Sequence, residues 1–146
     1  MDEIDVTILE FLKLKGRATS AEISQKIHLS LPSVAERIKK LEESGIIEKY
    51  VTKINKRVLG YNILAFIFVQ LRNSDYIDKF RQTIVTFDFV LECYHMAGNY
   101  DYLLKVVVSD LQNLDELLGS RIKKIPGITH TNTYICLFTI KEEINP

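Results

Sequence analysis

The chain has 146 residues, and its nineteen basic and nineteen acidic side chains cancel to a formal net charge of zero. Hydrophobic residues make up 47% and charged residues 26%, which is typical of a globular protein of one domain or two small ones. This balance excludes a uniformly basic protein that coats DNA, and no apolar run reaches the roughly 18 residues of a membrane helix.

Helix start and stop signals divide the first 45 residues into three predicted helices. Polar caps at the starts and glycines after the ends mark them: Asp2, Thr19, Ser30, Gly16 and Gly45. Within each segment, apolar residues recur at spacings of three and four, as on the buried face of a helix. A turn of about three residues, 28–30, separates the short second helix (20–27) from the longer third one. This is the spacing of a helix-turn-helix motif, with the third helix in the recognition position.

The third helix has a polar face about 120° from its apolar stripe. Basic side chains on such a face suit phosphates and guanine, and a carboxylate suits the amino group of cytosine. We therefore predict that DNA is contacted by polar residues of this helix and of the turns beside it: Ser20, Ser30, Ser33, Glu36, Arg37, Lys39 and Lys40. The alternative is an ordinary solvated helix face, with Arg37 in a salt bridge to Glu22 or Glu36 inside the domain.

The second half of the chain reads as a sheet with two helices. A β-favouring segment at 46–51 and a polar linker at 53–60 come first. Predicted strands at 64–71, 89–97, 100–108 and 128–140 then alternate with helices at 74–87 and 110–125. The order βαββαβ predicts a ferredoxin-like unit with both helices on one face of an antiparallel sheet. The other face has no helix to cover it, and an exposed apolar sheet predicts a second copy of the chain as its partner.

The fold class is therefore α+β, in three parts. Residues 1–50 form a winged or plain helix-turn-helix DNA-binding domain, and residues 51–61 form a strand and linker. Residues 62–146 form a ferredoxin-like domain for oligomerisation and, as the family resemblance given below implies, for effector binding.

No motif for catalysis or metal binding stands out. The three histidines, His28, His95 and His130, form no cluster, and there is no P-loop, GxGxxG or GxSxG sequence. Cys93 and Cys136 lie in apolar runs and are predicted to be buried thiols. We expect no enzyme activity, no metal and no cofactor. The acidic start of the chain lacks the regions of a signal peptide, so we expect a cytoplasmic, nucleoid-associated protein with no membrane partner.

The order and spacing of these pieces resemble the Lrp/AsnC family of feast/famine transcription regulators along essentially the whole chain. The resemblance is carried by residues 4–9, 16–17, 33–47, 98–106 and 126–133. It implies a sequence-reading regulator of double-stranded DNA with a RAM/ACT-like C-terminal domain. It also implies dimers through the C-terminal sheets, often stacked into octamers, and a small amino acid bound where dimers meet.

The effector site implied by the resemblance falls on a turn and on the last strand: Gly98, Asn99, Tyr100, Asp101, Thr131 and Thr133. Asp101 would accept the ammonium group of an amino acid, and free N–H groups near Gly98 would hold its carboxylate. The alternative is that Gly98 and Asn99 only form a tight turn, which Asp101 caps.

Two further functional alternatives stay open at this point. One is an architectural protein that wraps or bends DNA with low sequence preference. The other is an effector-binding oligomer whose N-terminal helices make protein contacts and have no direct role on DNA. The steep salt dependence of phosphate contacts separates the second from a DNA-binding regulator.

Overall fold

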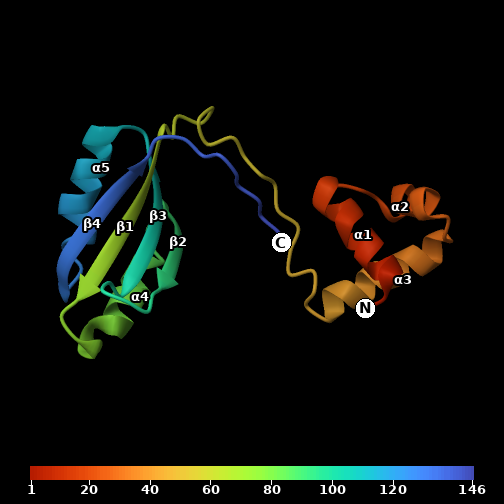
Figure 1. Cartoon of the computed structure of the whole chain (residues 1–146), viewed down its shortest axis with the longest axis horizontal. Coiled ribbons are helices and arrows are strands. Elements are labelled where there is room, and N and C mark those ends of the chain that lie inside the picture. The colour runs from red at the N-terminus through yellow and green to blue at the C-terminus, as the bar shows by residue number, and fades with distance from the viewer. The chain divides into compact units, whose positions relative to one another are not determined.

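The computed structural model describes residues 1–146 and divides them into two compact units (Figure 1). Unit 1 comprises residues 1–54 and 143–146, and unit 2 comprises residues 55–142. Each unit is described by itself below. None of the helices has the length and apolar character needed to cross a bilayer.

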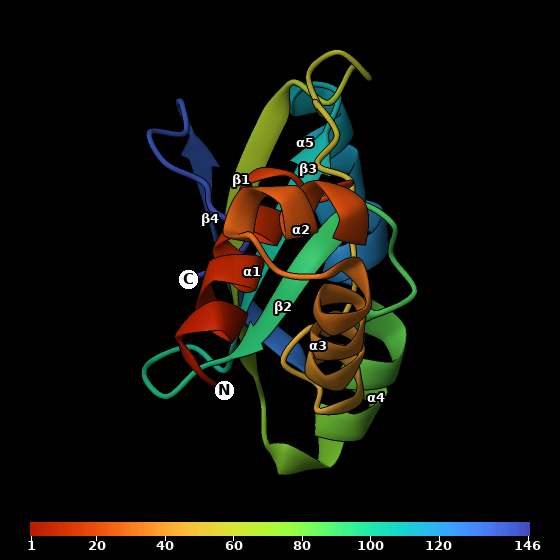
Figure 2. The ribbon, with the colours of Figure 1, turned by 90° about the vertical axis from the view of Figure 1, so that its right-hand side faces the viewer.

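Unit 1 contains the three predicted helices, α1 (Glu3–Leu14), α2 (Ser20–Ile27) and α3 (Leu31–Glu43) (Figure 2). Capping boxes close the starts of α1 and α2, in which Asp2 and Thr19 accept from backbone N–H groups three residues on. Ser30 caps α3 in the same way. The helices enclose one small core of four buried residues, Ile8, Ile23, Val34 and Leu41.

The strand expected at residues 46–51 does not form. The segment pairs with no strand of this chain, so its β-favouring side chains have no ladder to join. It instead closes the end of α3, because the N–H of Ile47 donates to the carbonyl of Leu41 at 3.0 Å. The Tyr50 hydroxyl donates to Glu42 at 2.8 Å. Burial and this bond raise the pKa of Tyr50 to about 12.

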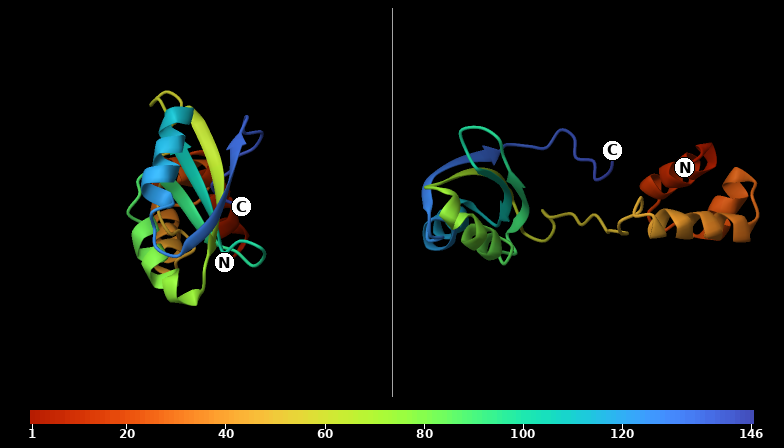
Figure 3. Two further views of the ribbon diagram at one scale, coloured as in Figure 1. Left: turned by 90° about the vertical axis from the view of Figure 1, so that its left-hand side faces the viewer. Right: turned by 90° about the horizontal axis from the view of Figure 1, so that it is seen from below.

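Unit 2 is a four-stranded antiparallel sheet with the strand order β2-β3-β1-β4. Its strands are β1 (Ile63–Leu71), β2 (Val90–His95), β3 (Tyr102–Val108) and β4 (Ile128–Cys136). Two helices, α4 (Ile77–Ile84) and α5 (Leu111–Leu117), cover one face of the sheet (Figure 3). The two most apolar strands, β1 and β3, are central, as the βαββαβ order predicts.

Both crossover helices are shorter than expected from the sequence. A 3-10 turn, Ser74–Tyr76, precedes α4, and the chain leaves helical geometry after Ile84. Helix α5 continues into a single π-helical turn, Leu118–Ile122, closed by the Lys123 N–H, which donates to the carbonyl of Leu118 at 2.9 Å. The last strand ends at Cys136, which pairs with Leu64, because β1, its only neighbour, begins one residue before Leu64 and offers nothing to pair with 138–140.

The two faces of the sheet differ sharply. Alternate residues of β1, such as Ala65, Ile67 and Val69, are fully buried under the helices. The residues between them, Phe66 and Phe68, lie on the other face, which we call the open face. The open face is lined by cross-strand neighbours of these two residues and by side chains of β2: Leu103, Lys105, Asn132, Tyr134, Glu92 and Tyr94.

The expectation of two buried thiols is not met. Cys93 is exposed and Cys136 is half-buried, and neither forms a disulfide. Each lies on an edge strand of the sheet, β2 or β4, where cover by the rest of the chain is least. Burial still raises the pKa of the Cys93 thiol.

Candidate functional site

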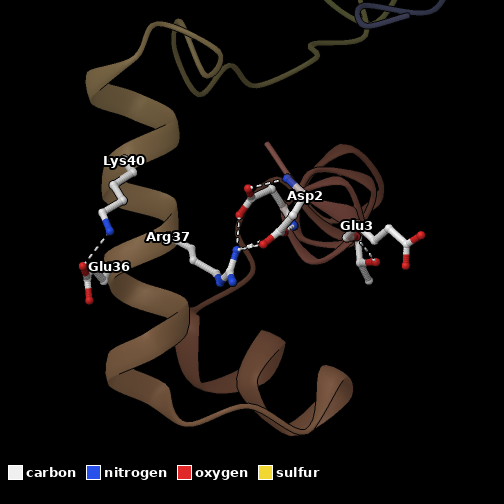
Figure 4. A network of polar contacts seen from close by, with 7 residues as sticks. Asp2, Glu3, Glu36, Arg37 and Lys40 are labelled. Carbon is white, nitrogen blue, oxygen red and sulfur yellow. Dashed lines mark hydrogen bonds and ion pairs between the residues drawn. The ribbon is translucent and has the colours of Figure 1, made fainter.

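The exposed surface of α3 carries most of the residues that the sequence predicted for DNA contact. Lys40 lies one helical turn after Glu36 and pairs with it at 2.8 Å (Figure 4). Lys39 pairs with Glu43 at 3.6 Å. Both lysine side chains are about 70% exposed, at 69% for Lys40 and 71% for Lys39. Pairs of this kind on one helix are weak, so a phosphate can displace the carboxylate at little cost.

The electrostatics of this surface keep its acidic residue ionised. The hydrogen bond from Lys40 and its positive charge hold the pKa of Glu36 below its usual range. An ionised Glu36 accepts hydrogen bonds only, as recognition of a cytosine amino group requires. A shallow hollow of about 590 Å³ runs beside this face. It is lined by residues of α3 and of the segments around it: Met1, Asp5, Leu29, Ser33, Glu36, Arg37, Lys40, Leu41, Ser44 and Ile46.

Arg37 is placed differently from the two lysines. Its Nη1 donates to both carboxylate oxygens of Asp2, at 3.0 and 2.8 Å, and to Oδ1 of Asp5 at 2.7 Å (Figure 4). The sequence offered Glu22 or Glu36 as internal partners of Arg37. In the structure these two glutamates pair with Lys15 and Lys40 instead.

The serines of the predicted set stand at helix starts. The Ser30 and Ser33 hydroxyls lie 2.8 Å apart, and Ser30 also accepts from the Ser33 N–H. Ser20 is the first residue of α2, directly after its cap. The turn between α2 and α3 is made by His28, which ends α2 in the left-handed conformation at φ 56°. The first turns of α2 and α3 therefore carry serine hydroxyls, which are suitable donors to phosphates.

Two basic residues that the sequence analysis did not select belong with this surface. Arg17 precedes α2, and Lys26 lies in its last turn. Both side chains are exposed, and neither is in an ion pair. The available signal was their position, one just before the first helix of the motif and one in its last turn. Cations without a partner lose nothing when they bind a phosphate, so they are better placed than Arg37 for backbone contact.

The predicted effector residues lie in the loop before β3 and along β4, and they do not share one pocket. Asp101 receives the Leu71 N–H on Oδ2 at 2.6 Å, and its own N–H donates to the carbonyl of Val69. Gly98 has a φ of 154°, and it lies with Asn99 in the exposed loop 96–101 between β2 and β3. The carboxylate of Asp101 therefore ties this loop to the end of β1.

The remaining effector residues are divided between the two faces of the sheet. Tyr100 packs on Phe68, with ring centroids 5.3 Å apart, and stacks on His130 on the open face. Thr131 and Thr133 pair with Val69 and Ile67, whose side chains point toward the helices. Cross-strand partners share a face, so the threonines lie on the opposite side from Tyr100. One chain does not bring all six residues around a single ligand.

The open face also holds a charged network among its aromatic side chains. Lys105 lies 3.2 Å from Glu92 and 3.3 Å from Glu142, and only 14% of its side chain is exposed. Burial alone would lower the pKa of Lys105, but the bonds to the two glutamates raise it above its ordinary value. The network keeps an ammonium ionised on a largely apolar surface. Elsewhere in the chain, no three His, Cys, Asp or Glu residues stand close enough to hold a metal ion.

Comparison with known proteins matches both units. The profile of the Lrp/AsnC ligand binding domain matches residues 64–146, and that of a winged helix-turn-helix DNA-binding domain matches residues 1–48. The HTH-type transcriptional regulator FL11 of Pyrococcus abyssi is 37% identical, over 97% of this chain and 93% of its own length. The leucine-responsive regulatory protein of Escherichia coli is 31% identical, over 97% of this chain and 88% of its own.

Solved structures agree with these sequence matches. A transcriptional regulator of Neisseria meningitidis in complex with L-Met superposes with a TM-score of 0.95 at 27% identity, covering 99% of this chain and 94% of that one. LrpC of Bacillus subtilis superposes with a TM-score of 0.88 at 31% identity, covering 98% and 99%.

A three-helix reading unit joined to a βαββαβ sheet unit defines a class of DNA-binding transcriptional regulators. The winged helix-turn-helix profile fits the first unit, although this chain forms no wing strand after α3. The chain belongs to the Lrp/AsnC family. That family consists of transcriptional regulators, and the resemblance seen in the sequence is confirmed.

Proposed function

We propose that this regulator reads the major groove with the exposed face of α3 and holds the DNA backbone with the groups around it. The observation that carries the proposal is the solvated face of Ser33, Glu36 and Lys40 on the last helix of a helix-turn-helix unit. Lys39, Ser20 and Ser30 flank this face, and the unpaired Arg17 and Lys26 extend it over α2. The protein acts on DNA in the cytoplasm, at the nucleoid, and carries no catalytic activity.

A salt series of DNA binding tests this proposal. The probe is a fluorescent duplex from the promoter region of the protein's own gene, with anisotropy as the readout. Lys40→Ala and Lys26→Ala should each weaken binding and each lower the salt slope by about one unit. Lys79→Ala, which removes an exposed lysine of α4 in unit 2, is the matched control and should leave both quantities unchanged.

Footprinting on the same duplex separates a sequence reader from an architectural protein. A reader protects half-sites spaced by about 10 bp or its multiples. Protection without sequence preference would instead favour wrapping. An unchanged slope and affinity for Lys40→Ala would contradict α3 as the recognition helix.

We propose further that the open face pairs two copies of the chain. Phe66 and Phe68 are half-buried there, while Tyr94 and Tyr134 are 50% and 55% exposed within one chain. Phe68→Glu should raise the monomer fraction in sedimentation experiments, because a charge would be buried at the centre of the pair. Val85→Glu places the same charge on a side chain that is 78% exposed at the end of α4, and it should leave the mass unchanged.

Amino-acid modulation is the third part of the proposal. A relative of known structure is in complex with L-Met. The six predicted residues lie in the loop before β3 and on β4. Because one chain divides them between two faces, a complete site would take residues from neighbouring copies, so dimers stacked into an octamer would complete it. Titration calorimetry with L-methionine and the other amino acids tests this, with Asp101→Asn expected to abolish the heat. No heat from the wild-type protein at millimolar concentration would leave Asp101 with the turn-capping role alone.

A further inference from the structure

Arg37 is the one cation of the predicted DNA-binding set that is held by residues from another helix. Asp2 and Asp5 belong to the start of α1, 35 and 32 positions away in the sequence. The Arg37 side chain is 30% exposed and that of Asp5 is 15% exposed. The ion pairs of Lys39 and Lys40, in contrast, stay within α3 and are open to solvent.

The two carboxylates are themselves fixed in place. Asp2 accepts the Asp5 N–H at 2.9 Å, and Asp5 accepts the Asp2 N–H at 2.9 Å. These backbone bonds, followed by the bonds from Arg37, hold the pKa of both carboxyl groups below their usual range. Asp2, Asp5 and Arg37 form a three-residue cluster, the α1–α3 clamp, which joins the start of α1 to the middle of α3. Figure 4 shows Asp2 and Arg37 of this cluster.

Moving Arg37 onto a phosphate would have consequences beyond its own side chain. Two ionised carboxylates would lose their only cation, and both would stand close to the polyanion that Arg37 had joined. Lys40 can leave Glu36 without disturbing the contact between any two helices. Lys40 can therefore exchange its carboxylate partner for a phosphate, whereas the bonds of Arg37 hold it within the protein.

We propose that Arg37 is a positioning residue of the DNA-reading surface: clamped by Asp2 and Asp5, it fixes where α3 lies on α1 and does not itself contact the DNA. This inference rests on the proposed reading role of α3 and assigns a part in it to the start of the chain. A recognition helix must keep a fixed position in its unit, because the other helix of the motif contacts the DNA backbone while the recognition helix contacts the edges of bases. The core beneath α3 has four buried residues, and the clamp adds a polar contact between α1 and α3 to this packing.

The sign of one variant's effect decides between positioning and contact. If Arg37 contacts DNA, the Asp2→Asn/Asp5→Asn double variant releases its guanidinium and removes two negative charges near the phosphates. Binding should then tighten, with a steeper salt slope. If Arg37 positions α3, the same variant loosens the helix. Binding should then weaken by about tenfold, the effect of misplacing one base contact.

The matched control is Glu10→Gln/Glu22→Gln, measured on the same promoter duplex with the full-length protein. It removes two carboxylates of the same unit, which pair with Lys13 and Lys15, and leaves the clamp intact. Tighter binding of the control with weaker binding of the clamp variant supports the proposal. Equal tightening of both variants overturns it.

A second variant keeps the proposal falsifiable if the double variant fails to fold, as judged by circular dichroism. Arg37→Ala should weaken binding while the salt slope stays at the wild-type value, and a slope lower by about one unit overturns the proposal. Lys40→Ala in the same series reports on the reading role of α3 separately. If Lys40→Ala leaves slope and affinity unchanged, the proposed function fails whatever the clamp variants do.

Discussion

The sheet unit encloses fourteen buried residues, supplied mainly by β1, β3 and the two covering helices, whereas the three-helix unit encloses only four. The helical unit adds two reciprocal capping boxes and an ion pair between α1 and α3. In a unit with so small a core, each buried side chain and each cap supplies a large share of the stability. In a larger core, each residue supplies a smaller share. The difference teaches that caps and ion pairs supplement a small core in the DNA-binding unit, whereas a larger core holds the sheet unit.

The largest expected effect comes from the same truncation made in each unit. Ile23 and Ile67 are both fully buried. Ile23→Ala and Ile67→Ala should each cost about 3 kcal/mol, because buried methyl groups are lost and a cavity remains. In the helical unit this loss removes one of four core residues, so Ile23→Ala should make unit 1 unfold well before unit 2.

Thermal melts followed by far-ultraviolet circular dichroism check this expectation. The wild-type protein and Ile67→Ala should each show one transition, and Ile23→Ala should show two. Val6→Ala is the surface control in α1, since Val6 is 44% exposed, and it should change stability by no more than about 0.5 kcal/mol. Identical melting profiles for the two core variants would show that the units do not differ in this way.

A smaller loss is expected from a close approach in the sheet unit. Gly127 has a φ of 92°, and a Cβ there would lie 2.1 Å from Cγ of Tyr76. Gly127→Ala should cost about 2 kcal/mol through the steric clash and the strained backbone, measured by urea unfolding. Gly60→Ala has nearly the same φ, 90°, with no atom within 4 Å, so it isolates the backbone part. Equal costs for both variants would mean that Tyr76 moves aside freely.

Loss of a helix cap tests the polar contribution to the helical unit. Thr19 accepts the Glu22 N–H at 3.2 Å at the start of α2. Thr19→Ala should destabilise unit 1 by about 1 kcal/mol, and Thr19→Ser, which keeps the hydroxyl, should cost much less. The readout is the midpoint of the first transition in urea, measured in the Ile23→Ala background, where unit 1 is expected to unfold separately from unit 2. A shift of the second transition would mean that loss of the cap destabilises unit 2, which would contradict this prediction.

The smallest expected effect is a gain in stability. His28 ends α2 with a φ of 56°, a conformation that disfavours residues with a Cβ. His28→Gly should stabilise unit 1 by about 0.5 kcal/mol, because glycine is the preferred residue at this position. His28→Ala keeps the Cβ and serves as the comparison. A loss of stability in the glycine variant would indicate that the imidazole makes a contact that outweighs the backbone strain.

Much of the fold followed from local patterns in the sequence. The three helix starts were predicted from Asp2, Thr19 and Ser30, and each of these residues caps its helix in the structure. The order of apolar segments predicted the βαββαβ unit and its two central strands. The strand at 46–51 was predicted wrongly, because β-favouring residues form a strand only where another strand is available for pairing.

The sites were harder to predict because they depend on contacts between distant residues. A helical wheel places Arg37 on the polar face of α3, but its partners lie at the start of α1, and no local spacing connects them. The predicted effector residues were divided by strand register: pairing with Ile67 and Val69 turns Thr133 and Thr131 toward the helices, while Tyr100 packs on the open face. The exposure of Arg17 and Lys26 likewise appears only once their surroundings are known.

The π-helical turn at Leu118–Ile122 is a place where one residue could be deleted from the chain while the fold is kept. A π turn holds about one residue more than an α turn. Removing the exposed Gly119 would let the turn tighten into α geometry, with Ile122 and Ile125 still facing the core. Here a deletion of one residue would be absorbed by the winding of the helix and would not rotate the side chains that follow. Related chains are therefore free to differ by one residue at this place without rebuilding the domain.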